Sequence, residues 1–230
     1  MNDVPLRFAE SVARLIDDKS LHNLKDVNSG LFGTAGRSLW EKRLRIHFNI
    51  VYNSTAKTFD YCLSCRRCNG NGDFGPVEAY TYDPIDHRFV RYFVVRLLKD
   101  RISLHIPEAT WMSATPSDPT LLKLLRAPFA RTNLLIFTKC HEFLILLPDY
   151  CTFNWIYASE LYNEVLDEII QRSQECGRLE EVNCKEFFRK RGRGASIEWI
   201  ATSKRLRYVS YNCVENPDSI NTVLTSIGVE

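Results

Sequence analysis

The spacing of apolar residues changes at about residue 42, and this change limits what the chain can fold into. Before it, Phe8, Val12, Leu15 and Ile16 recur at helical spacing. After it, apolar and polar residues alternate along residues 44–52, which is the pattern of a strand with one buried and one polar face. A helical segment followed by a sheet is therefore expected.

Three short helices are predicted within the first forty residues. Ser20 is a suitable N-cap for the second helix, which a Ser-Gly pair at 29–30 ends. The third runs through residues 32–40, where Gly33 and Gly36 lower the helix propensity.

Five segments between residues 44 and 106 are predicted as strands of an antiparallel meander. The first two form a hairpin around a turn at 53–57, and their outer face carries the polar residues. A glycine-rich loop at 68–76 follows, and the next segments are 77–82, 88–98 and 102–106. The segment 88–98 is apolar on both faces, as expected of a strand covered on both sides.

From residue 107 onward the pattern predicts shorter elements. After an irregular stretch at 107–118 and a short helix starting at Asp118-Pro119, a second hairpin is expected from strands at 134–137 and 143–147. Ser159 is the expected N-cap of a long amphipathic helix that Gly177 ends. The remaining predictions are a helical turn at 184–190, strands at 197–199 and 206–211, and a last helix that Asn216-Pro217 opens. The predicted class is α+β: a short helical module at 1–42, then a mixed, largely antiparallel sheet domain with helices at 43–230.

The order of residues in the first forty positions resembles an F-box. The matching positions are an apolar-Pro pair, three spaced apolar residues, a Ser-Leu-x-x-Leu core, and later apolar and aromatic positions: Val4-Pro5, Phe8, Val12, Leu15, Ser20, Leu21, Leu24, Val27, Phe32 and Trp40. The opening is also similar to that of a nematode-expanded family beginning Val-Pro-x-x-Phe. The chain departs from the usual pattern in having Val4 where Leu is usual, Phe32 where Trp is common, and glycines in the third helix.

The F-box resemblance implies a partner, the Skp-type adaptor of cullin-RING ubiquitin ligases. F-box modules bind chiefly through apolar side chains, so part of the helical module should remain uncovered by the protein's own core. The candidate adaptor-binding residues are Val4, Pro5, Leu6, Leu21 and Leu24, whereas Phe8, Val12 and Trp40 are expected to face inward. Residues 43–230 would then present an unknown target protein.

Charge and composition exclude several other classes. The 230 residues carry a formal net charge of +2, which provides no overall attraction to nucleic acid or to an anionic membrane. No apolar run approaches the ~18 residues of a membrane span, and acidic and basic residues interrupt the N-terminus early. A soluble protein of the cytoplasm or nucleus is expected, with its eight cysteines as thiols.

A cysteine-rich turn at Cys62–Cys68 is the sharpest local pattern. Its residues 65–72 are similar to the Cys-x-x-Cys-x-Gly-x-Gly knuckle of J-protein chaperones, in which paired knuckles bind zinc. One knuckle supplies two thiolates, here Cys65 and Cys68, and a closed zinc site needs about four ligands. If the strand continues through Cys65, Cys62 points to the opposite face. We therefore expect no bound metal, with Cys65 and Cys68 as weak candidates.

The basic run 189–193 suits phosphate contact, but a solvated loop between a helix and a strand is the preferred interpretation. No P-loop, His-Glu-x-x-His or Gly-x-Ser-x-Gly motif is present, so no enzyme chemistry and no cofactor are predicted. The favoured function is a substrate-recruiting, F-box-like interaction adaptor without a nucleic-acid partner. The alternative is a zinc- or nucleic-acid-binding module that uses the cysteine-rich turn and the basic run.

Overall fold

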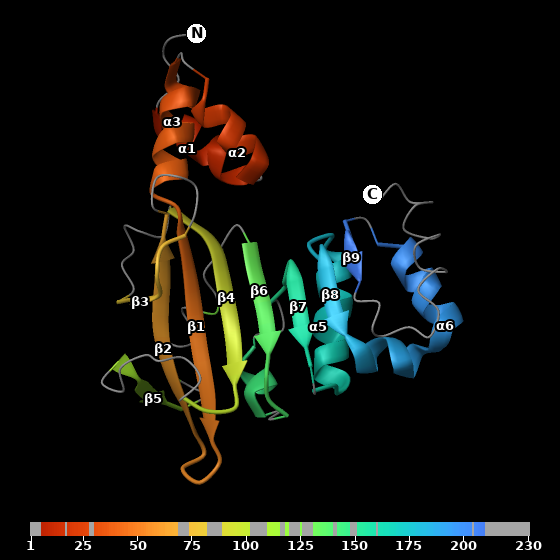
Figure 1. Ribbon diagram of the computed structural model, residues 1–230. Helices are drawn as coiled ribbons and strands as arrows, with labels where there is room; N and C mark the ends of the chain where they lie inside the picture. The colour runs from red at the N-terminus through yellow and green to blue at the C-terminus, as the bar shows by residue number, and fades with distance from the viewer. Residues whose placement is uncertain are drawn as a thin grey trace. The chain divides into compact units, whose positions relative to one another are not determined.

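A computed structural model describes most of the chain (Figure 1). The described residues are 6–16, 18–27, 30–68, 74–81, 89–101, 110–115, 118–119, 125, 131–139, 142–147, 151–159, 161–203 and 205–209. Contacts divide the chain into two compact units. The first comprises Met1–Phe48, Cys62–Phe93 and Pro128–Arg131, and the second comprises Asn49–Tyr61, Val94–Ala127 and Thr132–Glu230.

Three helices begin the first unit, as predicted. They are α1 (Leu6–Leu15), α2 (Asp18–Lys25) and α3 (Gly30–Glu41), and α3 packs against both of the others. Leu21 and Leu39 are among the fully buried side chains here. Strand β1 starts at Leu44, three residues after α3 ends, so the change of periodicity marks a true change of secondary structure.

The first hairpin is also confirmed, with β1 (Leu44–Asn53) and β2 (Thr58–Arg67) as neighbours in the sheet. The polar face of β1 is not solvated, however: His47 and Asn49 are as buried as Phe48 between them. Strands β3 (Glu78–Ala79) and β5 (Met112–Ala114) both pair with β2 in antiparallel register. The stretch 107–118 was expected to be irregular, so β5 corrects that prediction.

The strand order excludes the predicted meander. Among the described residues it is β3-β2-β1-β4-β6-β7-β8-β9, with β5 beside β2, so β4 (Val90–Leu98) follows β1 rather than β3. Figure 1 draws β1, β4, β6 and β7 with their arrowheads at the same end and β2 with its arrowhead at the other. The sheet is mixed and mostly parallel, so the prediction of a largely antiparallel sheet is wrong.

The parallel part of the sheet lies in the second unit. Strands β6 (Arg131–Ile136), β7 (Trp155–Ala158), β8 (Glu181–Cys184) and β9 (Tyr208–Val209) pair in parallel, with Leu134 opposite Ile156 and Ile156 opposite Val182. Helix α5 (Glu164–Glu175) connects β7 to β8, and α6 (Lys185–Ala201) connects β8 to β9. Such crossovers are how parallel neighbours are joined.

Three local predictions in this unit are wrong. Residues 143–147 were expected to complete a hairpin but belong mainly to the 3₁₀ helix η4 (Glu142–Leu146). The strand predicted at 197–199 lies inside α6. Helix α5 starts later than expected, because Asn163 rather than Ser159 caps it and accepts a hydrogen bond from the N–H of Leu166 at 2.9 Å.

Other predictions are confirmed or lie outside the described residues. Gly177 follows α5 with a φ of 64°, the left-handed conformation that ends many helices. The predicted strand at 102–106, most of the helix after Asp118-Pro119, and the last helix lie outside the described residues. Within the described part of the chain, no helix is long and apolar enough to cross a membrane.

Candidate functional site

Small residues form the packed side of α1, rather than the large ones that the periodicity suggests. Ala9 and Ala13, one turn apart, are fully buried, while Phe8 beside them is 55% exposed. The expectation that Phe8 faces inward is therefore wrong, and Val12 is only half-buried. Ala9 and Ala13 could have indicated this packed side from the sequence, since close contact between two helices requires small side chains where they cross.

Close packing also explains the glycines of α3. A Cβ built on Gly33 would overlap the carbonyl oxygen of Val27 and lie 3.3 Å from its carbonyl carbon. A Cβ on Gly36 would lie 2.9 Å from the Leu24 side chain and 3.1 Å from the backbone of Lys25. The two glycines therefore allow the end of α2 to lie directly against α3, which offsets their low helix propensity.

Several large apolar side chains of this helical module remain exposed. Eight large apolar side chains are exposed among the described residues, and four lie in or between the three helices: Leu6, Phe8, Val27 and Phe32. Val27 lies beside α3, because its carbonyl faces Gly33. The four side chains are called the exposed apolar set below.

The predicted adaptor-binding residues differ in how exposed they are. Leu6 is 41% exposed and available, and Leu24 is half-buried. Leu21 has no exposed surface, so the expectation that it lies on the uncovered face is wrong. Val4 and Pro5 lie outside the described residues.

Within the same unit, an arginine holds the end of α1. Arg91 of β4 is almost fully buried and donates to the carbonyl oxygens of Arg14, at 2.9 Å, and Ile16. The last carbonyls of a helix have no partner within it and carry its negative partial charge. Arg91 therefore fixes α1 by satisfying these carbonyls with a buried cation.

Arginines stacked on aromatic rings cover the start of β1. The Arg43 guanidinium lies 3.3 Å from the Trp40 ring centre, and Arg45 lies 4.6 Å from the Phe74 ring and 4.8 Å from the Tyr92 ring. Such contacts stabilise by about 0.5–2 kcal/mol each, most when desolvated. They keep the Arg43 and Arg45 side chains against aromatic rings at the start of this polar face.

The described residues of the cysteine-rich turn do not form a metal site. Strand β2 extends to Arg67, so by strand alternation the side chains of Cys62 and Cys65 lie on opposite faces. Cys68 forms an isolated bridge with Phe74, which brings the described ends of the glycine-rich segment together. No group of three or more His, Cys, Asp or Glu side chains suited to a metal ion occurs within the described residues.

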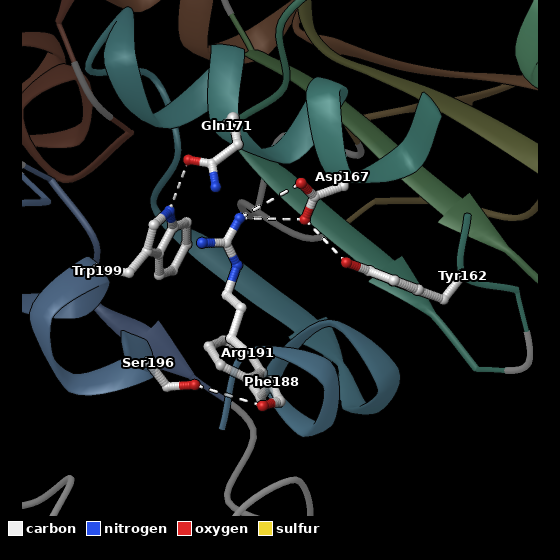
Figure 2. Close-up of polar contacts among 7 residues, drawn as sticks. All are labelled: Tyr162, Asp167, Gln171, Phe188, Arg191, Ser196 and Trp199. Atoms are coloured by element: carbon white, nitrogen blue, oxygen red, sulfur yellow. Dashed lines mark hydrogen bonds and ion pairs between the residues drawn. The ribbon is translucent and has the colours of Figure 1, made fainter. Parts of the chain in front are cut away.

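The basic run 189–193 lies in α6, across a kink at Gly192 (φ 72°), so it is not the predicted loop before a strand, although Arg189 and Lys190 are exposed as predicted. Arg191 donates to the Asp167 carboxylate at 3.1 Å, and Tyr162 donates to the same carboxylate at 2.9 Å (Figure 2). Arg189 pairs with Glu186 at 2.6 Å, and Lys190 lies 4.5 Å from the Tyr162 ring centre. These cations therefore take part in contacts within the protein.

The same polar contacts hold α6 against α5. Trp199 donates its indole N–H to Gln171 at 2.9 Å (Figure 2), and Gln174 donates to the Trp199 carbonyl at 3.0 Å. Burial, followed by the hydrogen bond to Asp167, raises the pKa of Tyr162 to about 12. The phenol therefore stays protonated, as a donor, throughout the physiological range.

A buried ion pair stabilises the contact of β2 with β5. Asp60 on β2 is paired with Arg101 and accepts a hydrogen bond from Ser113, its direct partner in the register of β5. Burying a carboxylate is costly unless it is paired and hydrogen-bonded, and Asp60 meets both conditions. It is therefore a structural group.

Comparison of the chain with protein-family models, with curated proteins and with solved structures finds no match in any of the three.

Proposed function

We propose that the chain is a protein-interaction adaptor whose helices α1–α3 bind the Skp-type adaptor of a cullin-RING ubiquitin ligase. The observation that carries this proposal is the exposed apolar set: half of the exposed large apolar side chains among the described residues lie in this short helical module. Exposed apolar surface is typical of interaction sites, and these four side chains belong to three helices that pack together. The resemblance of the same segment to an F-box names the partner.

The revised adaptor surface consists of the exposed apolar set, with the half-buried Leu24 as a further candidate and Leu21 removed. Leu21 supports the module from inside. Because Arg91 anchors the end of α1 and the α3 glycines fix α2, the exposed side chains stand on a preorganised support. Preorganisation reduces the conformational entropy lost on binding.

In this proposal the rest of the chain recruits a target protein, and the ligase acts on that target through proximity. No bond-making residue or cofactor of this chain is required. The sheet segments 43–230 would carry the target site.

The test measures binding of purified full-length protein to a recombinant Skp-type adaptor by isothermal titration calorimetry. Phe8→Asp and Phe32→Asp each remove an exposed ring. Burying a Phe side chain contributes roughly 1.5–3 kcal/mol, so each variant should bind about 10- to 100-fold more weakly. The matched control is Val165→Asp, because Val165 is 39% exposed on α5 and an acidic residue suits the first turn of a helix.

Two results would refute the proposal. One is an absence of wild-type binding at micromolar adaptor concentration. The other is a Phe8→Asp variant that binds as tightly as the Val165→Asp control, which would show that the exposed apolar set is not the contact surface. Far-ultraviolet circular dichroism of each variant confirms that the helices are intact.

A further inference from the structure

The end of α5 and the segment before β7 meet at Ser173. Ser173 is fully buried, and its hydroxyl accepts a hydrogen bond from the N–H of Phe153 at 3.0 Å. Its carbonyl accepts from the N–H groups of Arg178 and Leu179, both at 3.0 Å, because the chain reverses at Gly177. The segment that leads into β7 therefore lies against the reversal that follows α5.

Each of these two segments carries a cysteine. Cys176 is the C-cap residue of α5 and is exposed, whereas Cys151 is half-buried and lies two residues before Phe153. Both are free thiols, and the other described cysteines are buried or half-buried. Among the described cysteines, Cys176 is therefore the most accessible to a dissolved reagent.

The guanidinium of Arg178 is a common neighbour of the two thiols. It donates to Thr152, beside Cys151, at 3.4 Å and to the buried Asn154 at 3.3 Å, and these bonds hold it at the start of β7. Burial lowers the pKa of Arg178, and the negative charge of Cys176 and Cys151 as thiolates opposes this effect. Both sulfurs therefore lie within electrostatic range of one fixed cation.

An accessible thiol close to a second thiol is the arrangement of a redox-sensing pair. Reactive cysteines also tend to lie in partly exposed surroundings that contain a cation. Cys151 donates its S–H to the carbonyl of Leu125 at 3.6 Å, so it is a thiol that can supply the second sulfur. The pair therefore has an accessible member and a partner that follows it.

We infer that Cys176 and Cys151 form a reversible disulfide when the protein meets a peroxide, so that this pair is a redox-sensitive modification site. The inference does not rest on the proposed adaptor function. The bond joins residues 25 positions apart and ties the end of α5 to the segment before β7. A disulfide connects Cα atoms within about 7 Å of each other, and both cysteines lie outside strands and at or beyond a helix end, where small backbone shifts cost least.

The reaction has two steps in which atoms and electrons balance. The Cys176 thiolate attacks one peroxide oxygen, so that an S–O bond forms, the O–O bond breaks and hydroxide leaves, taking up the proton that the thiol lost. The Cys151 thiol then attacks the sulfur of the sulfenic acid, so that the S–S bond forms and water leaves with the Cys151 proton. Peroxide accepts the two electrons, and a dithiol reductant reverses the change.

The test treats reduced, full-length protein with hydrogen peroxide and then blocks the remaining thiols with N-ethylmaleimide. Disulfide-linked tryptic peptides are identified by mass spectrometry without reduction. Trypsin cleaves after lysine and arginine, so the expected product joins peptides 140–172 and 173–178. The same treatment in concentrated urea should not favour this product, because the unfolded chain does not hold the two segments together.

Two variants identify the second sulfur, because peptide 140–172 also contains Cys140. Cys140→Ser should keep the link, whereas Cys151→Ser should lose it and leave Cys176 as a sulfenic acid that dimedone traps. Fragmentation of the linked wild-type peptide distinguishes the same two cysteines without any substitution.

Two results would overturn the inference. One is a folded wild-type protein in which Cys176 is still fully alkylated after peroxide treatment. The other is a link to Cys176 that persists in Cys151→Ser, which would assign the second sulfur to another cysteine. No adaptor takes part in this assay, so its outcome is independent of whether the helical module binds one.

Discussion

Replacing Gly33 with alanine tests how the helical module is packed. Gly33 lies inside α3, where alanine would ordinarily stabilise a helix by about 1 kcal/mol. Here the added Cβ would overlap the Val27 carbonyl oxygen, a backbone atom that cannot rotate out of the way. The end of α2 must therefore move away from α3.

The cost of overpacking and the gain in helix propensity oppose each other, and their difference gives the expected change in the free energy of unfolding. Overpacking a buried contact costs typically 1–3 kcal/mol, and a backbone overlap belongs at the upper end of that range. After the gain in helix propensity, Gly33→Ala should lower the free energy of unfolding by about 2 kcal/mol. For a chain of this size that corresponds to a melting temperature about 4–8 °C lower.

Gly36→Ala and Gly194→Ala provide a graded comparison. At Gly36 the nearest atom belongs to the Leu24 side chain, which can move, so a net loss of about 1 kcal/mol or less is expected. Gly194 lies in α6 with nothing within 4 Å of an added Cβ, so alanine there should stabilise by up to about 1 kcal/mol.

Urea unfolding followed by circular dichroism measures all three variants, and hydrogen exchange of the α2 and α3 amides localises the effect. The expected order of stability is Gly194→Ala, wild type, Gly36→Ala, Gly33→Ala. A Gly33→Ala protein as stable as wild type would show that α2 and α3 are not in backbone contact, and the reasoning would fail.

Three further predictions follow from buried groups. Leu21→Asp should unfold the helical module, at a cost of about 3–5 kcal/mol for an unpaired buried charge, measured as lost helical dichroism; a folded variant would contradict the burial of Leu21. Glu181→Gln should raise the free energy of unfolding at pH 7 but not at pH 3, by urea titration. The raised pKa means that the folded protein keeps this proton to higher pH than the unfolded chain, so stability falls as pH rises through the interval between the two pKa values. Asp167→Asn should let Tyr162 ionise at lower pH in an ultraviolet titration, because Asp167 helps to raise its pKa; an unchanged titration would exclude this hydrogen bond as a cause.

Much of the local structure was predictable from the sequence. The three helices, the hairpin of β1 and β2, the doubly buried β4 and the end of α5 at Gly177 follow from periodicity and turn chemistry, which act over a few neighbouring residues. The small residues Ala9, Ala13, Gly33 and Gly36 were visible too. Their role in helix packing could not be predicted, because a small side chain indicates close packing only when a partner backbone lies beside it.

The tertiary structure alone decided which elements became neighbours. An apolar run such as 143–147 suits a buried strand or a buried helical turn equally, and the outcome depends on the space left by the surrounding elements. Likewise, alternation along β1 is the same whether its polar side chains meet water or, as Arg45 does, an aromatic ring. The pairing of Trp155 with Glu181 joins residues 26 positions apart through strand register, which no local pattern records. Local preferences therefore determined the elements, whereas long-range packing determined the parallel order of the strands and which of their residues became neighbours.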